Sequence, residues 1–402
     1  MGIVGIALFA LGIAASIALH EAGHMVAARA FGMRVRRYFI GFGPKVWSAT
    51  RGHTEYGLAA LPFGGFCDIA GMTANDRLTA EELPHAMHSK PAWQRVVVML
   101  GGVAMNVVLA MAITYFVAVF AAIPNPYADR TPRVGELVCA ADQAADGTFE
   151  ACDGPGPAQR AGVQVGDEIL AVDGRRVEAF SQVRDVVSAR PGEEVRLTLR
   201  RAGEELTVPV VVEAVDRYSQ ATGQRVSAGA IGVTSAPVEN AMASFGPLEA
   251  VPATARLTGQ MVDATWEGLL SFPGKIPGVM ASIFGAERDV NGPVSVIGAS
   301  RVGGELVQRS MWESFWMMLA SLNLFLALFN LVPLPPLDGG HIAVIAYERM
   351  RDWLRRARGL APGGAVDYTA LMPLTYAMAA LLLTIGVFVM VADVVNPVRI
   401  FG

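Results

Sequence analysis

Charged residues are scarce in this sequence: Asp, Glu, Lys and Arg together make up 17% of its 402 residues, whereas hydrophobic residues make up 53%. This balance lies outside the range of ordinary soluble domains, so we predict a membrane protein. The formal net charge is only −4 and no long basic tract occurs, which argues against a nucleic-acid partner. The sequence also lacks internal repeats and low-complexity segments, which excludes a repeat architecture.

Four long stretches are nearly free of charge: about 2–30, 96–123, 314–337 and 369–392. Each is long enough for a helix of about 20 residues to cross the hydrocarbon layer. The first nineteen residues have no positively charged start and lead directly into a metal-type motif, so we expect them to be retained as a span and not cleaved as a signal peptide. Prolines at 333, 335 and 336 break the third stretch, so we expect it to end at an internal cavity.

The short loops predict the orientation, because positively charged loops stay in the cytoplasm. Two loops are rich in such residues: Arg34, Arg36, Arg37, Lys45, Arg51, Arg77 and Lys90 after the first span, and Arg349, Arg351, Arg355, Arg356 and Arg358 after the third. We therefore expect a multi-pass plasma-membrane protein with both termini extracytoplasmic.

The motif His20-Glu21-Ala22-Gly23-His24 lies in the first span. Histidines four residues apart share one face of a helix, so both rings can bind one Zn²⁺ ion, and Glu21 is close enough to act on a water molecule at the metal. Chance histidines on a helix surface are the alternative. Ionisable groups inside an apolar helix are costly, however, which favours a functional site.

A catalytic zinc site needs a third protein ligand. The best candidate is Asp338, in the sequence Leu337-Asp338-Gly339 after the broken third stretch, because a carboxylate there would otherwise be unpaired. The alternatives are a capping role for Asp338, and His341 as the third ligand. A second-shell or structural role for His341 is the prediction we prefer.

Between the first two spans, residues 35–47 and 55–66 read as short strands with glycine-rich turns. We predict a hairpin that presents an extended peptide along its edge. The candidate contact residues are Gly41, Phe42, Gly43, Gly64 and Gly65. The alternative is a membrane-surface hairpin with no role in substrate binding. The next segment, 79–93, is predicted as an amphipathic helix.

The stretch 156–213 alternates small-residue turns, apolar strands and a helix near 180–188. It resembles the PDZ module of bacterial membrane-associated proteases, which implies binding of a chain end or an extended peptide by strand addition. A steric spacer that binds no peptide is the alternative. Cys139 and Cys152 lie in the same extracytoplasmic region, where an oxidising compartment would let them form a disulfide.

Taken together, the motif in the first span, the Gly-Phe-Gly-Pro loop, the single PDZ-like region and Leu337-Asp338-Gly339 resemble the site-2 proteases, which are intramembrane zinc metalloproteases. The likeness is greatest to single-PDZ actinobacterial members that act in envelope stress signalling. It implies zinc held by His20, His24 and Asp338, Glu21 as the general base, and an active site toward the cytoplasmic face.

The expected substrates are single-pass membrane proteins, such as anti-sigma factors, already trimmed by an upstream site-1 protease. Asn323 and Asn330 are candidates for binding the unwound substrate backbone, with helix packing as the alternative. A catalytically silent PDZ-bearing adaptor or metal-binding protein is the competing function, but it would need no general base at Glu21.

The predicted fold class is an α-helical polytopic membrane protein of about four transmembrane helices, with a cytoplasmic-side β-hairpin and one extracytoplasmic α+β domain. The predicted organisation has four parts: a first membrane unit at 1–123 with a substrate-presenting loop at 34–70, a PDZ-like domain at 124–240, an interfacial linker with an amphipathic helix at 241–311, and a second membrane unit at 312–402.

Overall fold

The structure is a computed structural model that describes residues 2–73, 76–144, 148–218, 225–286, 288–289, 292–361, 363–364 and 366–398. Its contacts divide the chain into two compact units. The first, which we name the helical unit, comprises Met1–Pro124, Ala243–Met280 and Val290–Gly402. The second, which we name the strand-rich unit, comprises Asn125–Met242 and Ala281–Asp289.

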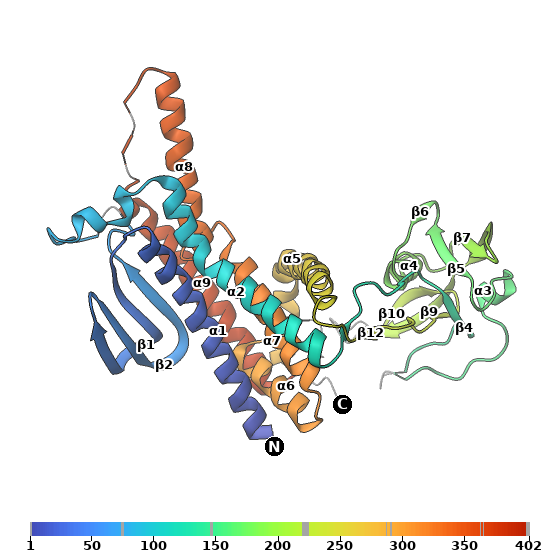
Figure 1. The fold of residues 1–402 in the computed structure, drawn as a ribbon. Helices are drawn as coiled ribbons and strands as arrows, with labels where there is room; N and C mark the ends of the chain where they lie inside the picture. Colours follow the sequence, from blue (N-terminus) through green and yellow to red (C-terminus); the bar gives the residue numbers. More distant parts are fainter. Residues whose placement is uncertain are drawn as a thin grey trace. The chain divides into compact units, whose positions relative to one another are not determined.

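Helices dominate the helical unit, and four of those described are long and apolar enough to cross a membrane, near the positions that the sequence predicts. Figure 1 shows α1 and α2 side by side. The four are α1 (Gly2–Ala30), α2 (Ala92–Phe120), α7 (Trp312–Asn330) and α9 (Met372–Val395), the last preceded by the short 3₁₀ helix η3 (Tyr368–Leu371). The other helices of this unit are α5 (Ala250–Ile283, its end in the second unit), α6 (Val296–Gln308) and α8 (Asp338–Ala357).

The helix α6 belongs to the core of the helical unit. Its Val302, Leu306 and Val307 are buried in one apolar cluster with side chains of α1 and α7, among them Phe9 and Phe315. Its glycines allow this contact, since a Cβ at Gly304 would lie 2.7 Å from the Ile6 side chain of α1. The sequence predicts an interfacial linker over 241–311; within it, α6 is too short to span a membrane and packs among helices that are long enough.

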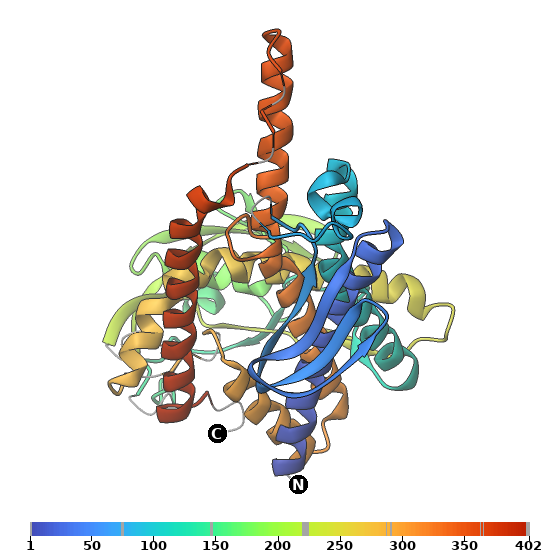
Figure 2. The same cartoon turned by 90° about the vertical axis from the view of Figure 1, so that its left-hand side faces the viewer.

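Against α1 lies a sheet made of β1 (Val35–Arg51) and β2 (Thr54–Ile69) (Figure 2). Both strands bend, and the first part of β1 pairs with two parts of β2, so that Tyr38 is opposite both Tyr56 and Cys67. Glycines in the left-handed region make the bends, including Gly41 at φ +88° and Gly64 at φ +87°. The hairpin predicted from the sequence is present, in a more folded form than two straight strands.

The segment predicted as an amphipathic helix at 79–93 is not one helix. It contains two short 3₁₀ helices, η1 (Leu83–His85) and η2 (Met87–Ser89), before α2 begins at Ala92. Pro84 and Pro91 explain the difference, because proline lacks the backbone N–H that a continuous helix requires at those positions.

The strand-rich unit has a core of small aliphatic side chains. Its main sheet has the order β6-β5-β7-β8, and Ile169, Val195, Leu197, Leu199 and Val210 are fully buried. The alternating burial of β7 is what a sheet covered on one face requires. The strands are β4 (Val134–Leu137), β5 (Glu168–Val172), β6 (Arg175–Arg176), β7 (Glu194–Arg201), β8 (Glu204–Val211), β9 (Glu213–Tyr218), β10 (Arg225–Ala230) and β11 (Val233–Ser235), with helices α3 (Pro157–Arg160) and α4 (Phe180–Ser188).

The two ends of the strand-rich unit meet each other. The Asn125 N–H donates to the Ala241 carbonyl at 2.8 Å, and the Asn125 side chain donates to the Asn240 carbonyl at 3.0 Å. The short strands β3 (Ile123–Pro124) and β12 (Met242–Ala243) adjoin these residues in the chain. The chain therefore leaves 125–241 beside the place where it enters.

Candidate metal centre

The centre lies where α1 crosses α2, and glycines set the separation of the two helices. A Cβ at Gly23 would overlap the carbonyl of Gly101, and a Cβ at Gly102 would lie 2.5 Å from His24 Nε2 and 2.7 Å from His20 Nε2. No side chain larger than hydrogen fits between α2 and the two rings. The local sequence Gly101-Gly102 thus provides the space that the histidines occupy.

Three donor atoms converge at this crossing, one from each of His20, His24 and Asp338. The Nε2 atoms of the two histidines are 3.2 Å apart, and Asp338 Oδ2 is 3.2 Å from His20 Nε2 and 3.3 Å from His24 Nε2. Both histidines are buried. Residues more than 300 positions apart in the sequence therefore form one cluster, as the sequence predicts for a metal site.

The spacing of these atoms fits a zinc ion. A tetrahedral site with bonds of about 2.0–2.1 Å has ligand-to-ligand edges of about 3.3 Å, and the three measured separations have this size. Asp338 Oδ2 is also buried without a hydrogen bond of acceptable geometry among the residues described. A buried acceptor of this kind is costly unless it has a partner, and a metal ion would supply one. Two imidazoles and a carboxylate are ligands that zinc commonly takes.

The far side of each imidazole is held by α2. Val98 O lies 2.8 Å from His24 Nδ1, and the Asn106 amide nitrogen is placed 3.2 Å from His20 Nδ1. Asn106 is fully buried, and its Oδ1 is without a hydrogen bond in the part of the chain described. The oxygen and nitrogen of an amide side chain are told apart only by their hydrogen-bond partners. If the Asn106 amide is turned by 180°, its Oδ1 accepts a hydrogen bond from the Nδ1–H of His20. Both rings would then present a bare Nε2 to the cluster.

Asp338 is the first residue of α8, and a tight loop brings it to the histidines. The helix α7 ends at Asn330, and the chain turns through 331–337 before α8 begins. Gly340 lies against this loop, where a Cβ would be 2.8 Å from the Leu334 carbonyl carbon. Asp338 thus lies just beyond the third span, where the sequence places it, because the prolines separate the two helices. Burial alone would raise the pKa of the Asp338 carboxyl, but the facing imidazoles hold that pKa well below its usual range.

The carboxylate of Glu21 faces the hairpin. Its Cγ would lie 3.1 Å from a Cβ at Gly65, and the backbone of Cys67 lies beside its carboxylate. Gly65 is thus the predicted contact residue that the structure brings beside the HExxH motif. Gly41 and Gly43 lie in the bend of β1, where Phe42 is 47% exposed, and Gly64 packs against the Phe42 ring.

The two asparagines of α7 have different surroundings. Asn323 is fully buried and donates to Ser16 Oγ of α1 at 3.0 Å and to the Leu319 carbonyl at 2.8 Å. These contacts fit the helix-packing role that the sequence leaves open. Asn330 is partly exposed at the end of α7, next to the loop that leads to Asp338. His341 stands apart from the three donor atoms, with its ring stacked on Tyr368.

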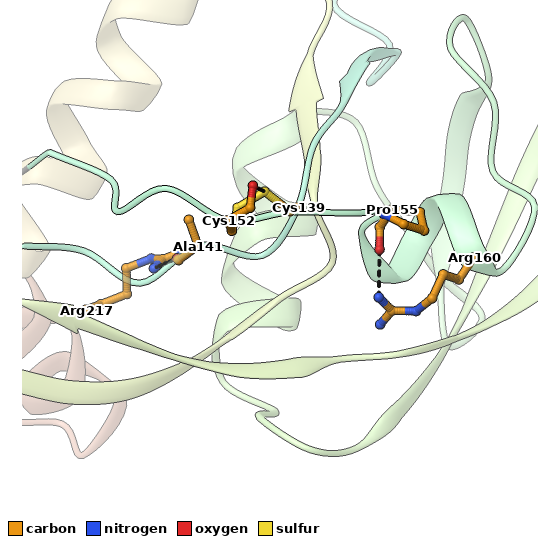
Figure 3. The surroundings of a disulfide bond; sticks show 6 residues. All are labelled: Cys139, Ala141, Cys152, Pro155, Arg160 and Arg217. Atoms are coloured by element: carbon orange, nitrogen blue, oxygen red, sulfur yellow. Dashed lines mark hydrogen bonds between the residues drawn. A yellow bond between two sulfur atoms is a disulfide. The ribbon is translucent and has the colours of Figure 1, made fainter.

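The strand-rich unit contains a groove. This groove of about 840 Å³ runs between α4, whose Phe180, Val183 and Val187 line it, and the stretch 228–234. Cys139 and Cys152, which the sequence nominates as a pair, are joined by a disulfide with Cα atoms 6.0 Å apart, and both line the groove. Figure 3 shows this bond, with Arg217 donating to the Ala141 carbonyl and Arg160 donating to the Pro155 carbonyl nearby.

Asn106 is the residue that sequence reasoning missed. Its amide side chain lies in the middle of an apolar span, where a polar group costs free energy unless it has a partner. The same argument pointed to Asn323 in the third span and could have pointed to Asn106.

The sequence was compared with known proteins. The profile of Peptidase family M50 matches residues 8–366. The zinc metalloprotease Rip1 of Mycolicibacterium smegmatis is 44% identical over 403 residues, which is 99% of each chain, and Rip1 of Mycobacterium tuberculosis is 41% identical over 405 residues, the full length of both. A putative zinc metalloprotease of Brucella suis is 30% identical over 351 residues, 83% of each chain. A profile match over most of the chain and full-length relatives above 40% identity agree with the geometry at His20, His24 and Asp338: this protein belongs to Peptidase family M50, the site-2 proteases.

Proposed function

We propose that this protein is a zinc metalloendopeptidase that hydrolyses peptide bonds within transmembrane segments. One observation carries the proposal: three donor atoms with zinc-type spacing are buried beside Glu21 in α1, a helix long and apolar enough to span a membrane. Family membership and the names of its relatives support the same reaction. Because the site lies along a membrane helix, substrates that reach it are themselves embedded in the bilayer.

His20, His24 and Asp338 would hold the metal. A zinc ion in such a site supplies Lewis acidity, which polarises a peptide carbonyl and activates water for hydrolysis. Glu21 acts as the general base and carries the proton of the attacking water to the leaving amide nitrogen. Asn106 and the Val98 carbonyl fix the orientation of the two rings from behind.

The strand next to Glu21 presents the substrate. The scissile carbonyl of a helical substrate is already hydrogen-bonded, so the substrate must unwind before water can attack it. The segment at Gly65 and Cys67 lies beside Glu21 and offers backbone groups to which an extended peptide can add as a further strand. Gly41, Phe42, Gly43 and Gly64 shape the bend of this sheet, and Asn330 contacts the unwound backbone from the end of α7.

The groove of the strand-rich unit fits the PDZ-like role predicted from the sequence. It combines an apolar helix face with a strand, the arrangement in which a peptide binds by strand addition. We propose that this unit is extracytoplasmic and receives the new chain end of a single-pass protein, such as an anti-sigma factor, after an upstream site-1 protease has trimmed it. The metal centre then faces the cytoplasmic side of the plasma membrane, with both termini outside.

The test compares the wild type with Glu21→Gln, each co-expressed with a tagged single-pass membrane protein lacking its outer domain. We expect the wild type to release an intramembrane fragment and Glu21→Gln to release none while it retains zinc. Zinc content is measured on the same purified proteins. If both proteins yield the same fragment, or if neither does although both bind zinc, the proposal fails and the silent-adaptor function gains support.

A further inference from the structure

A polar pocket of about 580 Å³ lies at the end of α1, between the turn of the β1–β2 hairpin and the segment before α2. Its lining is strongly basic. It includes three arginines, Arg29, Arg34 and Arg51, and two histidines, His53 and His85, with Glu81 as the acidic residue of the lining. The metal-centre proposal makes no use of any of these side chains.

The pairing of arginines differs sharply within this region. Arg36 hydrogen-bonds to Glu82 at 2.7 Å and to Asp76 at 3.1 Å, and Arg37 pairs with Asp68 at 2.8 Å. By contrast, Arg29 and Arg51 of the pocket have no carboxylate within ion-pair distance among the residues described, and Arg29 donates only to the neutral hydroxyls of Thr54 and Tyr56. The neighbouring arginines are neutralised by the protein itself, whereas the pocket leaves its positive charge for something else.

Inside the pocket, two basic groups are in direct contact. Arg34 Nη2 lies 2.8 Å from His53 Nδ1, although the Arg34 side chain is only 18% exposed. Its acidic neighbour Glu81 is 3.5 Å away with a side chain that is 83% exposed, and such an exposed pair contributes little. A half-buried guanidinium beside an imidazole is stabilised when an anion accepts hydrogen bonds from it.

The position of the pocket along α1 indicates where such an anion would come from. This helix has 29 residues, so it is about 43 Å long and exceeds the roughly 30 Å of hydrocarbon. Arg29, in its last turn, therefore lies near the lipid headgroups. Trp93 is 59% exposed and is packed edge-on against Phe31, which follows Arg29 by two residues. Exposed tryptophan is typical of the membrane–water interface.

We propose that this pocket binds the phosphate of an anionic phospholipid headgroup. Guanidinium groups suit phosphate because their planar fork can bind two of its oxygens at once. Arg29 belongs to α1, whereas Arg51 and His53 belong to the hairpin, so a bound headgroup bridges the two elements. The same hairpin carries Gly65 and Cys67 beside Glu21, so the lipid stabilises the sheet that lies beside the metal centre.

The test uses the full-length protein in detergent. It is titrated with dioctanoyl phosphatidylglycerol, dioctanoyl phosphatidylcholine or inorganic phosphate, and native mass spectrometry measures how many molecules are bound. We expect the phosphatidylglycerol to bind at least 10-fold more tightly than the phosphatidylcholine. Arg51→Gln should weaken its binding about 5-fold, the effect of one basic residue near an anionic headgroup, and Arg34→Gln/Arg51→Gln about 25-fold.

Arg37→Gln is the matched control, because it removes the same charge from the same sheet outside the pocket, and it should change the affinity less than 2-fold. His53→Gln, in the exposed turn, provides a second variant if Arg34→Gln does not fold. Equal affinity for the two lipids, or equal losses in Arg51→Gln and Arg37→Gln, would overturn the proposal. Inorganic phosphate that binds as tightly as the anionic lipid, with the same dependence on Arg51, would overturn the lipid source and assign a free phosphate instead. None of these results depends on peptidase activity.

Discussion

The two units tolerate opposite kinds of change. The strand-rich unit is held by an aliphatic core in which Leu197 and Leu199 are fully buried, so it depends on atoms that are present. At its metal centre, the helical unit depends on the absence of side chains at Gly23 and Gly102, because only glycine there lets α1 and α2 approach each other. Lipid removes much of the hydrophobic driving force between helices, so close backbone approach and polar contacts replace it. Matched substitutions can test this contrast.

The largest expected effect is in the strand-rich core. Leu197→Ala should lower the free energy of unfolding of this unit by about 2–5 kcal/mol, because it leaves a cavity in a packed sheet. Hydrogen exchange of peptides from β5, β7 and β8 in the full-length protein measures the loss. The control is Leu383→Ala in α9, where the side chain is 70% exposed and should matter little. Equal effects of the two changes would show that the strand-rich unit does not depend on its buried aliphatic core.

Adding a single carbon at the metal centre comes next. Gly102→Ala should lower peptidase activity by about 100-fold or more, since the new Cβ displaces the two imidazoles and misplacement by about 1 Å has that cost. Activity and zinc content are measured together. Gly386→Ala in α9 is the matched control, because its Cβ would meet nothing within 4 Å. A fully active Gly102→Ala protein would show that the crossing relaxes easily.

Asn106 and Asn323 are both fully buried in the helical unit, but we expect only Asn106 to affect zinc binding. Asn106→Ala should weaken zinc binding about 10-fold or more, because the orientation of His20 is lost, and Asn106→Asp should retain most of the affinity by keeping an acceptor oxygen. Asn323→Ala should instead reduce stability by about 0.6 kcal/mol and leave zinc affinity unchanged. Chelator competition provides the affinities. If Ala and Asp at position 106 behave alike, Asn106 does not orient His20.

The last expected effect concerns an acid-sensitive contact in the strand-rich unit. Burial raises the pKa of Asp167. Two hydrogen bonds from Arg201 at 2.6 and 2.8 Å, one from the Gln164 N–H at 2.8 Å and the charge of Arg201 together outweigh burial, so this pKa lies below its usual range. A depressed carboxyl pKa stabilises the fold above the unfolded value of about 3.9, and this stability is lost as the pH falls through the folded pKa.

We therefore expect the unit to lose stability as the pH falls from about 5 through the folded pKa of Asp167. The measurement is hydrogen exchange of peptides from β5 and β7, corrected for the intrinsic effect of pH. Arg201→Gln should make this loss smaller, because it removes the cause of the depressed pKa. An unchanged pH profile in that variant would assign the acid sensitivity elsewhere.

Sequence reasoning succeeded where spacing alone determines geometry. Histidines four apart must share a helix face, and an apolar stretch of about 20 residues must be a candidate span, so His20, His24 and the four long helices were predictable. The choice of Asp338 rested on the cost of an unpaired carboxylate, and the structure brings that carboxylate to the histidines.

Sequence reasoning could not reach the features that tertiary packing decides. Nothing local in residues 296–308 shows that this short helix packs against α1. The side of α7 that carries Asn323 depends on where α1 lies, and the double pairing of β1 depends on bends that only the folded sheet defines. Asn106 was visible in the sequence, but its partner, the His20 ring, comes from another helix.

The hydrogen bond between Asn125 and Ala241 has a consequence for how such a protein can change over time. A region that begins and ends at one point behaves as a cassette. A recombination event can replace, duplicate or delete 126–240 and rejoin the chain with a short turn, without altering a residue of the metal centre. The strand-rich unit and the metal centre can therefore evolve separately, and a chimaera built at this junction should inherit its metal centre from one parent and its strand-rich unit from the other.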